Sequence, residues 1–267
     1  MKHHFFPYDL GFRGLSLGLM VLLAQPSHAA LITHFDFDGG SLTDNAGGVV
    51  ASAVGGGTST TGYSGDAWSF SGSNYLRAGV NVRQDNMPQM TWGAWVRSDS
   101  TTSVRQVLSI DDNTPGDFDR SIAIDHRGGG GVGWSAFRGP ASGGQVVGSG
   151  SRPVTAGQWT FLAASYDETI NEMRFYVDNM AAIVASTAFT SGHLFFDIGH
   201  NPDHGELFLG AIDEVFVFDE VLSAAQIENI RQNGVASAVT ASEPGSFALV
   251  GVLAFLLARR RRGQSEA

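Results

Sequence analysis

Short runs in which apolar and polar residues alternate recur along most of the chain. The clearest is 90–97, MTWGAWVR, where every second residue from Met90 to Val96 is apolar and falls on one face of a strand. Alternation with a period of two, in runs rich in aromatic and β-branched residues, is typical of β-strands. We predict such strands at 31–37, 67–71, 74–78, 90–97, 106–110, 121–125, 131–137, 159–166, 173–178, 181–185 and 194–199.

Two pairs of these strands are predicted to form hairpins. A glycine-containing turn separates 67–71 from 74–78, and Asp178-Asn179 separates 173–178 from 181–185. Both connections contain the residue types that favour tight turns.

The stretch 207–234 is predicted to close the domain. Apolar residues between 207 and 218 fall on both faces, so this strand is expected at a central position of a sheet. Ser223 and Gln226 have the spacing of a capping box at the start of a short helix, which is expected to end at Gly234.

Together these elements predict one all-β domain over residues 30–234. About a dozen short strands separated by turns, with a single helix at the end, are typical of a β-sandwich or jelly roll. The chain has 267 residues, 35 of them glycine, and its 18 Phe, 5 Trp and 5 Tyr can supply the core of such a fold.

The first 29 residues are predicted to be a secretory signal peptide. Basic and polar residues up to Arg13 precede an apolar run at 15–23, and Ser27-His28-Ala29 places small residues where a signal peptidase cuts. An uncleaved membrane anchor is the alternative, although the apolar run is short for a span.

The other end of the chain predicts a sorting tail at 243–267, after a small-residue linker at 235–242. Its features are Glu243, Pro244 and Gly245, an apolar run at 247–258, and the cluster Arg259, Arg260, Arg261 and Arg262. Arginines at this position favour a cytoplasmic end. The order resembles the PEP-CTERM sorting signal of Gram-negative bacteria, although Ser242 stands where that signal has its first proline.

The PEP-CTERM resemblance implies several partners and a location. It implies export machinery and an exosortase-type protease as partners, and transient anchoring in the inner membrane through the tail. It also implies a final place in the cell envelope or extracellular matrix. A permanent tail anchor remains the alternative.

The charge of the predicted domain argues against nucleic acid as a partner. Residues 30–242 contain ten Arg, no Lys and 23 acidic residues, whereas binding to a phosphate backbone needs a positive surface. Acidity suits cation binding or neutral sugars, and it is also explained by solubility alone. With no cysteine, the fold depends on its core and on any bound metal.

Seven fragments, taken in order, resemble the laminin-G-like, concanavalin A-like jelly roll. They are LITHFDFD, AWSFSGSNYLRA, MTWGAWVR, QWTFLAASYDE, MRFYVDNM, FFDIGH and FLGAIDEVFVFDEVLSAAQIENI, and they cover nearly all of residues 31–233. This superfamily contains both enzymes and binding modules, so fold alone does not decide function.

The acidic residues do not match the catalytic pattern of the family's glucanases. Those enzymes carry Glu-x-Asp-x-x-Glu on one strand, and the two glutamate positions are Ala211 and Phe216 here. We therefore expect a non-catalytic binding module for polysaccharide or another surface component. The alternatives are a glycan-active hydrolase or lyase and a passive structural protein of the matrix.

The resemblance also implies a structural calcium ion between the first and the closing strand. Carried over by position, the candidate ligands are Asp213 together with Asp36 or Asp38 and nearby carbonyl oxygens. A carboxylate among core residues is costly unless it is paired or holds a cation. The alternative is that main-chain N–H groups satisfy Asp213 without a metal.

Sugar binding usually requires an aromatic ring flanked by polar groups. The candidates are Trp134, Phe137 and Arg138, beside the glycine run 128–131, with burial in the core as the alternative. Two further loops, 111–119 and 200–204, carry possible metal ligands but are also explained as solvated turns.

Overall fold

A computed structural model describes residues 29–102, 104–112, 119–137, 139, 146–187 and 192–240. The predicted sorting tail and all of the predicted signal peptide except Ala29 lie outside these residues. None of the helices in the described part of the chain has the length and hydropathy needed to span a membrane.

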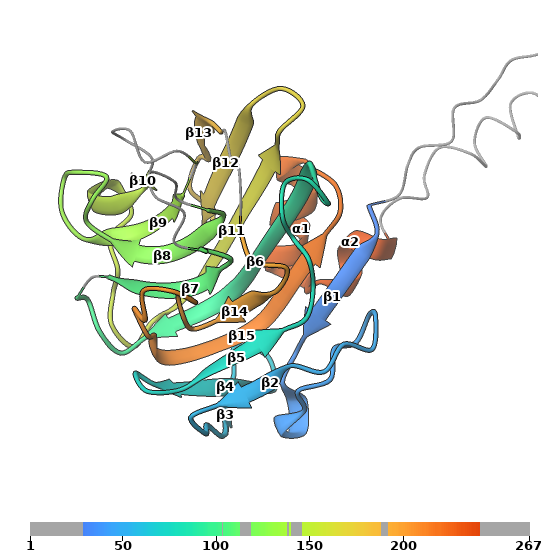
Figure 1. Cartoon of the computed structure of the whole chain (residues 1–267), viewed down its shortest axis with the longest axis vertical. Helices are drawn as coiled ribbons and strands as arrows, with labels where there is room; N and C mark the ends of the chain where they lie inside the picture. The colour runs from blue at the N-terminus through green and yellow to red at the C-terminus, as the bar shows by residue number, and fades with distance from the viewer. Residues whose placement is uncertain are drawn as a thin grey trace, which may run out of the picture.

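Two antiparallel sheets stack face to face to form a sandwich (Figure 1). The eight-stranded sheet has the order β13-β12-β11-β6-β15-β4-β3, and β1 pairs with β15. Its strands are β1 (Leu31–Phe35), β3 (Ser59–Thr61), β4 (Asp66–Ser71), β6 (Gln89–Ser98), β11 (Trp159–Asp167), β12 (Glu172–Val177), β13 (Ile183–Ser186) and β15 (Leu209–Phe218).

The seven-stranded sheet has the order β10-β9-β8-β7-β14-β5-β2. Its strands are β2 (Ser52–Val54), β5 (Tyr75–Ala78), β7 (Arg105–Ser109), β8 (Ser121–Asp125), β9 (Gly133–Phe137), β10 (Val146–Val147) and β14 (Phe196–Ile198). Two short 3-10 helices, η1 (Asp38–Gly40) and η2 (Ser149–Ser151), lie in the connections. The all-β sandwich predicted from the sequence is confirmed.

Strand β6 shows how the alternation of the sequence builds two separate apolar layers. Trp92 and Val96 have no exposed surface and belong to the main core between the sheets. Trp95 points the other way, into a second cluster on the outward face of the eight-stranded sheet. This strand therefore buries both of its faces.

The central position predicted for the closing strand β15 is confirmed. One edge of β15 pairs with β6 along most of its length. Its other edge pairs first with β4, through 209–212, and then with β1, through 215–218. A bulge separates these two halves, and Glu214 adopts a left-handed φ of 52° there. The acidic pair Asp213-Glu214 thus marks the point at which β15 changes partner.

Two helices cover part of the outward face of the eight-stranded sheet. Helix α1 (Ala224–Asn233) has the predicted capping box, in which the Ser223 hydroxyl accepts a hydrogen bond from the Gln226 N–H. The first residues of the segment predicted as a linker are part of the folded domain. Val235 is buried, and α2 (Ala236–Thr240) packs in the same apolar cluster as α1. The apolar contacts of Val235 and Ala238 therefore attach this segment to the sandwich.

The two hairpins predicted from turn residues have different outcomes. Strands β12 and β13 pair as predicted, with Asp178 in a left-handed conformation at the turn. The prediction of a hairpin between β4 and β5 is wrong, because these strands belong to different sheets. The Asn74 side chain accepts from the Ser71 N–H and donates to the Ser69 carbonyl, which fixes the crossing from one sheet to the other.

The two ends of the domain lie beside each other. The Ala30 N–H donates to the Asp219 carboxylate, and the Asp219 N–H donates to the Ala30 carbonyl. Ala29 also packs against the apolar cluster that contains Ala238 of α2. Figure 1 shows β1 beginning next to α2.

Candidate ligand-binding site

A row of polar residues crosses the outward face of the seven-stranded sheet. In these strands apolar residues such as Leu76 and Ile198 point into the core. The residues that alternate with them along each strand therefore point outward. The register places one outward residue from each of the adjacent strands β2, β5, β14, β7 and β8 side by side, in the order Ser52, Arg77, Asp197, Ser109 and Ser121. This face is therefore polar where the other face of the same strands is apolar.

Asp197 is the centre of an ion-paired cluster on this face. Its carboxylate has no exposed surface and accepts two hydrogen bonds from the Arg77 guanidinium, Nε to Oδ1 at 2.8 Å and Nη2 to Oδ2 at 2.9 Å. The His200 ring adds a contact from Nδ1 to Oδ2 at 2.7 Å. The hydrogen bond to Asp197 raises the pKa of Arg77 above its ordinary value. Arg77 is thus held in one orientation while 36% of its side chain stays exposed.

Aromatic rings flank the Arg77 guanidinium. The Tyr75 and His200 rings stack with centroids 4.0 Å apart and an angle of 13°. The Arg77 guanidinium carbon lies 3.8 Å from the centroid of Phe195, within the range of a cation–π interaction. His193 stacks in turn on Phe195 at 4.5 Å. We call Tyr75, Arg77, Phe195, Asp197 and His200 the Asp197 cluster.

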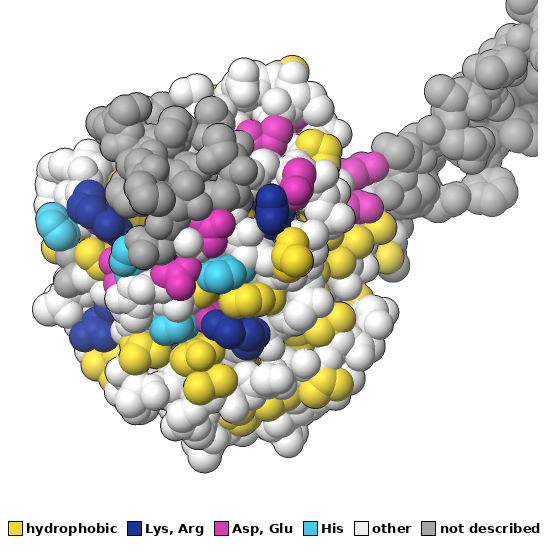
Figure 2. Space-filling view, in the orientation of Figure 1, with side chains coloured by type: hydrophobic (Ala, Val, Ile, Leu, Met, Phe, Trp, Pro, Cys, Tyr) yellow, Lys and Arg dark blue, Asp and Glu magenta, His cyan; other side chains and the backbone are white. Residues whose placement is uncertain are grey.

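The loop after β14 brings further polar groups to this face. Asn201 is buried, and its Nδ2 donates to Asp111 at 2.9 Å and to Glu206 at 3.2 Å. Glu206 also accepts from Gln106 at 2.7 Å, which ties the loop to β7. Figure 2 shows basic, acidic and histidine side chains gathered on the face turned toward the viewer. The face can therefore offer both donors and acceptors to a ligand.

The aromatic residues predicted to bind sugar lie in the interior. Trp134 packs in the main core between the sheets, and Phe137 packs in a small cluster with Ala123 and Val146. Neither ring has a face open to solvent, so the structure corrects their prediction as a stacking surface. Arg138 lies outside the described residues.

Each of the three carboxylates predicted to bind calcium accepts main-chain N–H groups. Asp213 accepts main-chain N–H groups of Tyr63 and Ser64 on Oδ2 and of Glu214 on Oδ1. Asp38 accepts the Asp66 N–H, and Asp36 accepts the Asp38 N–H and the Asn45 side chain.

These hydrogen bonds offer an explanation for these carboxylates that does not require a metal ion. N–H donors that point at a carboxylate satisfy it without a cation, and calcium prefers a cage of oxygen ligands. Within the described ranges, no three or more His, Asp or Glu side chains are placed to hold a metal ion. Calcium binding by these carboxylates and nearby carbonyl oxygens stays a prediction of the sequence.

The structure describes only part of the first loop with candidate metal ligands, 111–119, and all of the second, 200–204. Residues 113–118 of the first loop lie outside the described part. In the second loop, Asn201 Oδ1 accepts the N–H groups of Asp203 and His204, which builds a tight turn. His200 and Asn201 of this loop are buried against the seven-stranded sheet rather than solvated.

Comparison with known proteins identifies the family. Residues 70–228, more than half of the chain, match the model of the concanavalin A-like lectin/glucanases superfamily. The chain belongs to this superfamily. No curated protein matches the sequence.

Several solved structures have a similar fold. One is domain 4 of AbnA, a GH43 extracellular arabinanase from Geobacillus stearothermophilus, in complex with arabinotriose. It has 21% identity, a TM-score of 0.61, and coverage of 77% of this chain and 100% of that chain. The binding domain of botulinum neurotoxin serotype D has 13% identity and a TM-score of 0.56, with 76% and 51% covered.

A third example is the binding domain of Paraclostridial Mosquitocidal Protein 1, at 8% identity and a TM-score of 0.55, with 76% and 52% covered. The chain spans about half the length of these toxin binding domains. At such identities, the likeness shows that this member of the concanavalin A-like superfamily shares their fold.

Sequence reasoning missed the Asp197 cluster, although one of its residues had a local signal. In FFDIGH the core residues Phe196 and Ile198 flank Asp197, so alternation alone places this carboxylate on the outward face. The partner Arg77 lies 120 residues away in the chain, and no local pattern indicates that β5 and β14 are neighbours.

Proposed function

We propose that this protein is an exported, non-catalytic module that binds polysaccharide through the Asp197 cluster. The observation that supports the proposal most directly is the Arg77 guanidinium. It is fixed by two hydrogen bonds to Asp197, flanked by aromatic rings, and partly exposed on the outward face of a sheet. A rigid group of this kind binds a ligand with little loss of conformational entropy.

The chemistry of the cluster suits a sugar. The C–H faces of a pyranose or furanose pack against aromatic rings, and its hydroxyls accept hydrogen bonds from a guanidinium. The acidic balance of the domain favours neutral glycans over nucleic acid. The complex of AbnA domain 4 with arabinotriose shows that a protein of this fold can hold an oligosaccharide.

The acidic residues of β15 support a non-catalytic role. A glycosidase needs two carboxylates that face one cleft. Asp213 is buried and held by main-chain N–H groups, while Glu214 Oε2 lies 2.7 Å from His34 Nε2. The two carboxylates therefore have separate partners and do not face a common substrate.

Export and envelope anchoring rest on the terminal segments. We propose that the signal peptide is removed after Ala29 and that the tail is processed near Glu243-Pro244-Gly245. Mass spectrometry of the mature protein from its host checks both cuts. A mature chain that still ends at Ala267 would contradict processing of the tail.

Isothermal titration with a panel of trisaccharides, including arabinotriose, laminaritriose, cellotriose and chitotriose, tests binding. Tyr75→Ala removes one ring of the cluster but keeps the ion pair, and we expect it to weaken binding at least tenfold. Arg77→Lys keeps the charge but loses the paired hydrogen bonds, and we expect a similar loss. Arg174→Ala is the matched control, since Arg174 is an exposed arginine paired with Glu172 on the other sheet.

Two outcomes would overturn this proposal. Affinity that is unchanged in Tyr75→Ala and Arg77→Lys would show that the cluster does not bind the sugar. Release of new reducing ends from the matching polysaccharides at high protein concentration would show that the protein is an enzyme.

A further inference from the structure

Tyr63 is an exposed aromatic residue on the face opposite the Asp197 cluster. Its ring lies flat on the Trp95 ring, with centroids 3.4 Å apart and an angle of 10°. Trp95 is buried in the outer apolar cluster of the eight-stranded sheet. Tyr63 itself is 47% exposed, and Trp95 covers one face of its ring, so the opposite face is open to solvent.

A buried carboxylate fixes the main chain that carries this ring. The N–H groups of Tyr63 and Ser64 donate to Asp213 Oδ2 at 2.9 and 3.1 Å. A Cβ at Gly62 would lie 2.6 Å from the same oxygen, so only glycine allows the turn to approach so closely. Burial of a carboxylate costs free energy, and here it holds an exposed tyrosine in one position.

An aromatic ring and arginine side chains lie beside Tyr63. The Trp159 ring meets Tyr63 edge-on at 6.5 Å, and the Arg97 guanidinium carbon lies 5.4 Å from the Trp159 centroid. Arg231 of α1 is also nearby: hydrogen bonds to Glu228 raise its pKa, and Tyr63 adds to that increase.

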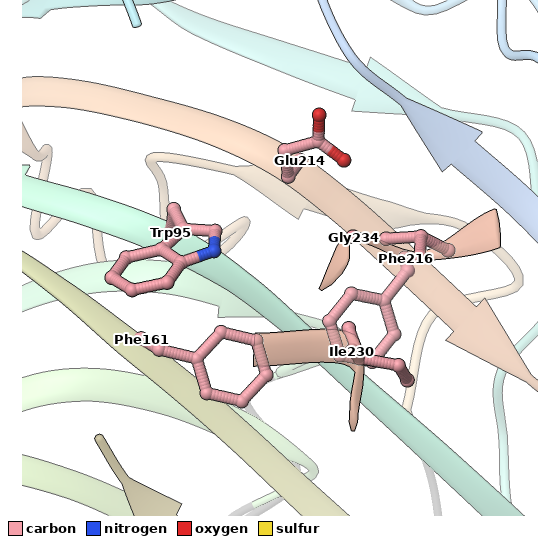
Figure 3. Close-up of a pocket in the computed structure, with 7 residues that line it drawn as sticks. Trp95, Phe161, Glu214, Phe216, Ile230 and Gly234 are labelled. Carbon is pink, nitrogen blue, oxygen red and sulfur yellow. The ribbon is translucent and has the colours of Figure 1, made fainter. Parts of the chain in front are cut away.

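The floor beneath this surface is closed. Trp95, Phe161, Phe216 and Ile230 pack around a small cavity, and the Glu214 carboxylate points away from the two phenylalanine rings (Figure 3). The space in this cavity that is available to water is only about 10 Å³, which is close to the minimum for one water molecule. A ligand would therefore lie on the Tyr63 ring and not beneath it.

We propose that Tyr63, Trp95, Trp159 and Arg97, the Tyr63 platform, form a second carbohydrate-binding site that is independent of the Asp197 cluster. The open ring of Tyr63 takes the C–H face of a pyranose, and the Arg97 guanidinium donates to its hydroxyls. The ring is held in place before any ligand arrives, which lowers the entropic cost of stacking.

The position of the platform gives the molecule two binding faces. The Asp197 cluster lies outside the seven-stranded sheet, and the Tyr63 platform lies outside the eight-stranded sheet. A single molecule can therefore hold two separate polysaccharide chains and link them.

Titration of the full chain with the same trisaccharide panel tests the second site. We expect two sites per molecule in the wild type and one in Tyr63→Ala, together with a loss of the change in tryptophan fluorescence that stacking above Trp95 causes. Tyr63→Phe keeps the ring and retains both sites. Circular dichroism and thermal melting show whether each variant folds, and Trp159→Ala serves as a second variant should Tyr63→Ala unfold.

The two proposals fail in different ways. One site per molecule that is insensitive to Tyr63→Ala and Trp159→Ala overturns the Tyr63 platform and leaves the Asp197 cluster. One site that is lost in Tyr63→Ala but unaffected by Tyr75→Ala keeps the platform and overturns the cluster. Binding of none of the trisaccharides overturns both, as does capture of a protein partner without any sugar binding.

Discussion

Asp213 holds the main chain at Tyr63 and Ser64, but ionisation of its buried carboxyl group destabilises the native state. The side chain has no exposed surface, and burial raises its pKa to about 7, with the adjacent Glu214 adding to the increase. Three main-chain N–H groups act in the opposite direction without restoring the ordinary value. At neutral pH the native state therefore carries a carboxylate that is only partly ionised.

This raised pKa predicts a pH dependence of stability. The native state binds the Asp213 proton more tightly than the unfolded chain, so the free energy of unfolding falls as pH rises from about 4 to about 7. Since one pKa unit corresponds to about 1.4 kcal/mol, we expect the loss between pH 5 and pH 8 to exceed ~1 kcal/mol.

Urea denaturation of the wild type and of Asp213→Asn at pH 5 and pH 8 measures this loss. The raised pKa values of Glu168 and Asp178, also caused by burial, act in the same direction in both proteins. The comparison thus isolates Asp213, and an equal pH dependence in the two proteins would contradict the assignment.

At the same scale, single residues show where sequence reasoning succeeds and where it ends. The alternation in 90–97 placed Met90, Trp92 and Val96 on one face, and that face of β6 lies in the core, because a period of two is a local property. It could not tell whether Trp134 meets solvent or a second sheet, since that depends on packing between distant segments. The calcium ligands were carried over by position, and position does not show that N–H groups already surround Asp213.

At the scale of elements, the strands were predicted more reliably than their partners. The capping box of α1 and the central position of β15 follow from local spacing and from apolar residues on both faces, and both are confirmed. The pairing of β4 and β5 failed because a short turn suggests a hairpin, whereas here it connects two sheets. The small residues of 235–242 likewise suggested a linker and concealed the apolar contacts of α2.

The two valines around α2 allow a matched test of its role. Val235 is 2% exposed and Val239 is 45% exposed. We expect Val235→Ala to lower the free energy of unfolding by roughly 1.5 kcal/mol, because it removes two buried methyl groups' worth of apolar contact. Val239→Ala should change it by less than about 0.5 kcal/mol. Chemical denaturation of both variants measures the difference, and equal losses would indicate that α2 does not pack as described.

At the scale of the whole molecule, the sandwich separates support from recognition. The main core between the sheets holds the strands, while both outward faces carry the side chains proposed to meet ligands. Loops and outward residues can change in such an arrangement without loss of the core. The resemblance of seven sequence fragments to the concanavalin A-like jelly roll predicted this architecture. The series of alternating strands predicted two layers independently, because their apolar faces have to be buried.

The calcium prediction is tested by the stability of the whole molecule. If an ion bridges β1 and β15, its removal by excess EDTA lowers the melting temperature by a few degrees, since a ligand bound only by the native state stabilises it. Added calcium should then restore the transition, whereas magnesium serves as the control. A transition that does not move in EDTA would rule out a stabilising calcium ion at Asp213, Asp36 or Asp38.

The hydrogen bonds between Ala30 and Asp219 place the first residues of the domain next to the end of its last strand. A fold whose ends adjoin can be inserted into a surface loop of an unrelated host protein through short connectors. Its ends can also be joined and the chain reopened at another loop. This domain could thus serve as a cassette in fusion proteins, with both sheet faces left outside the host.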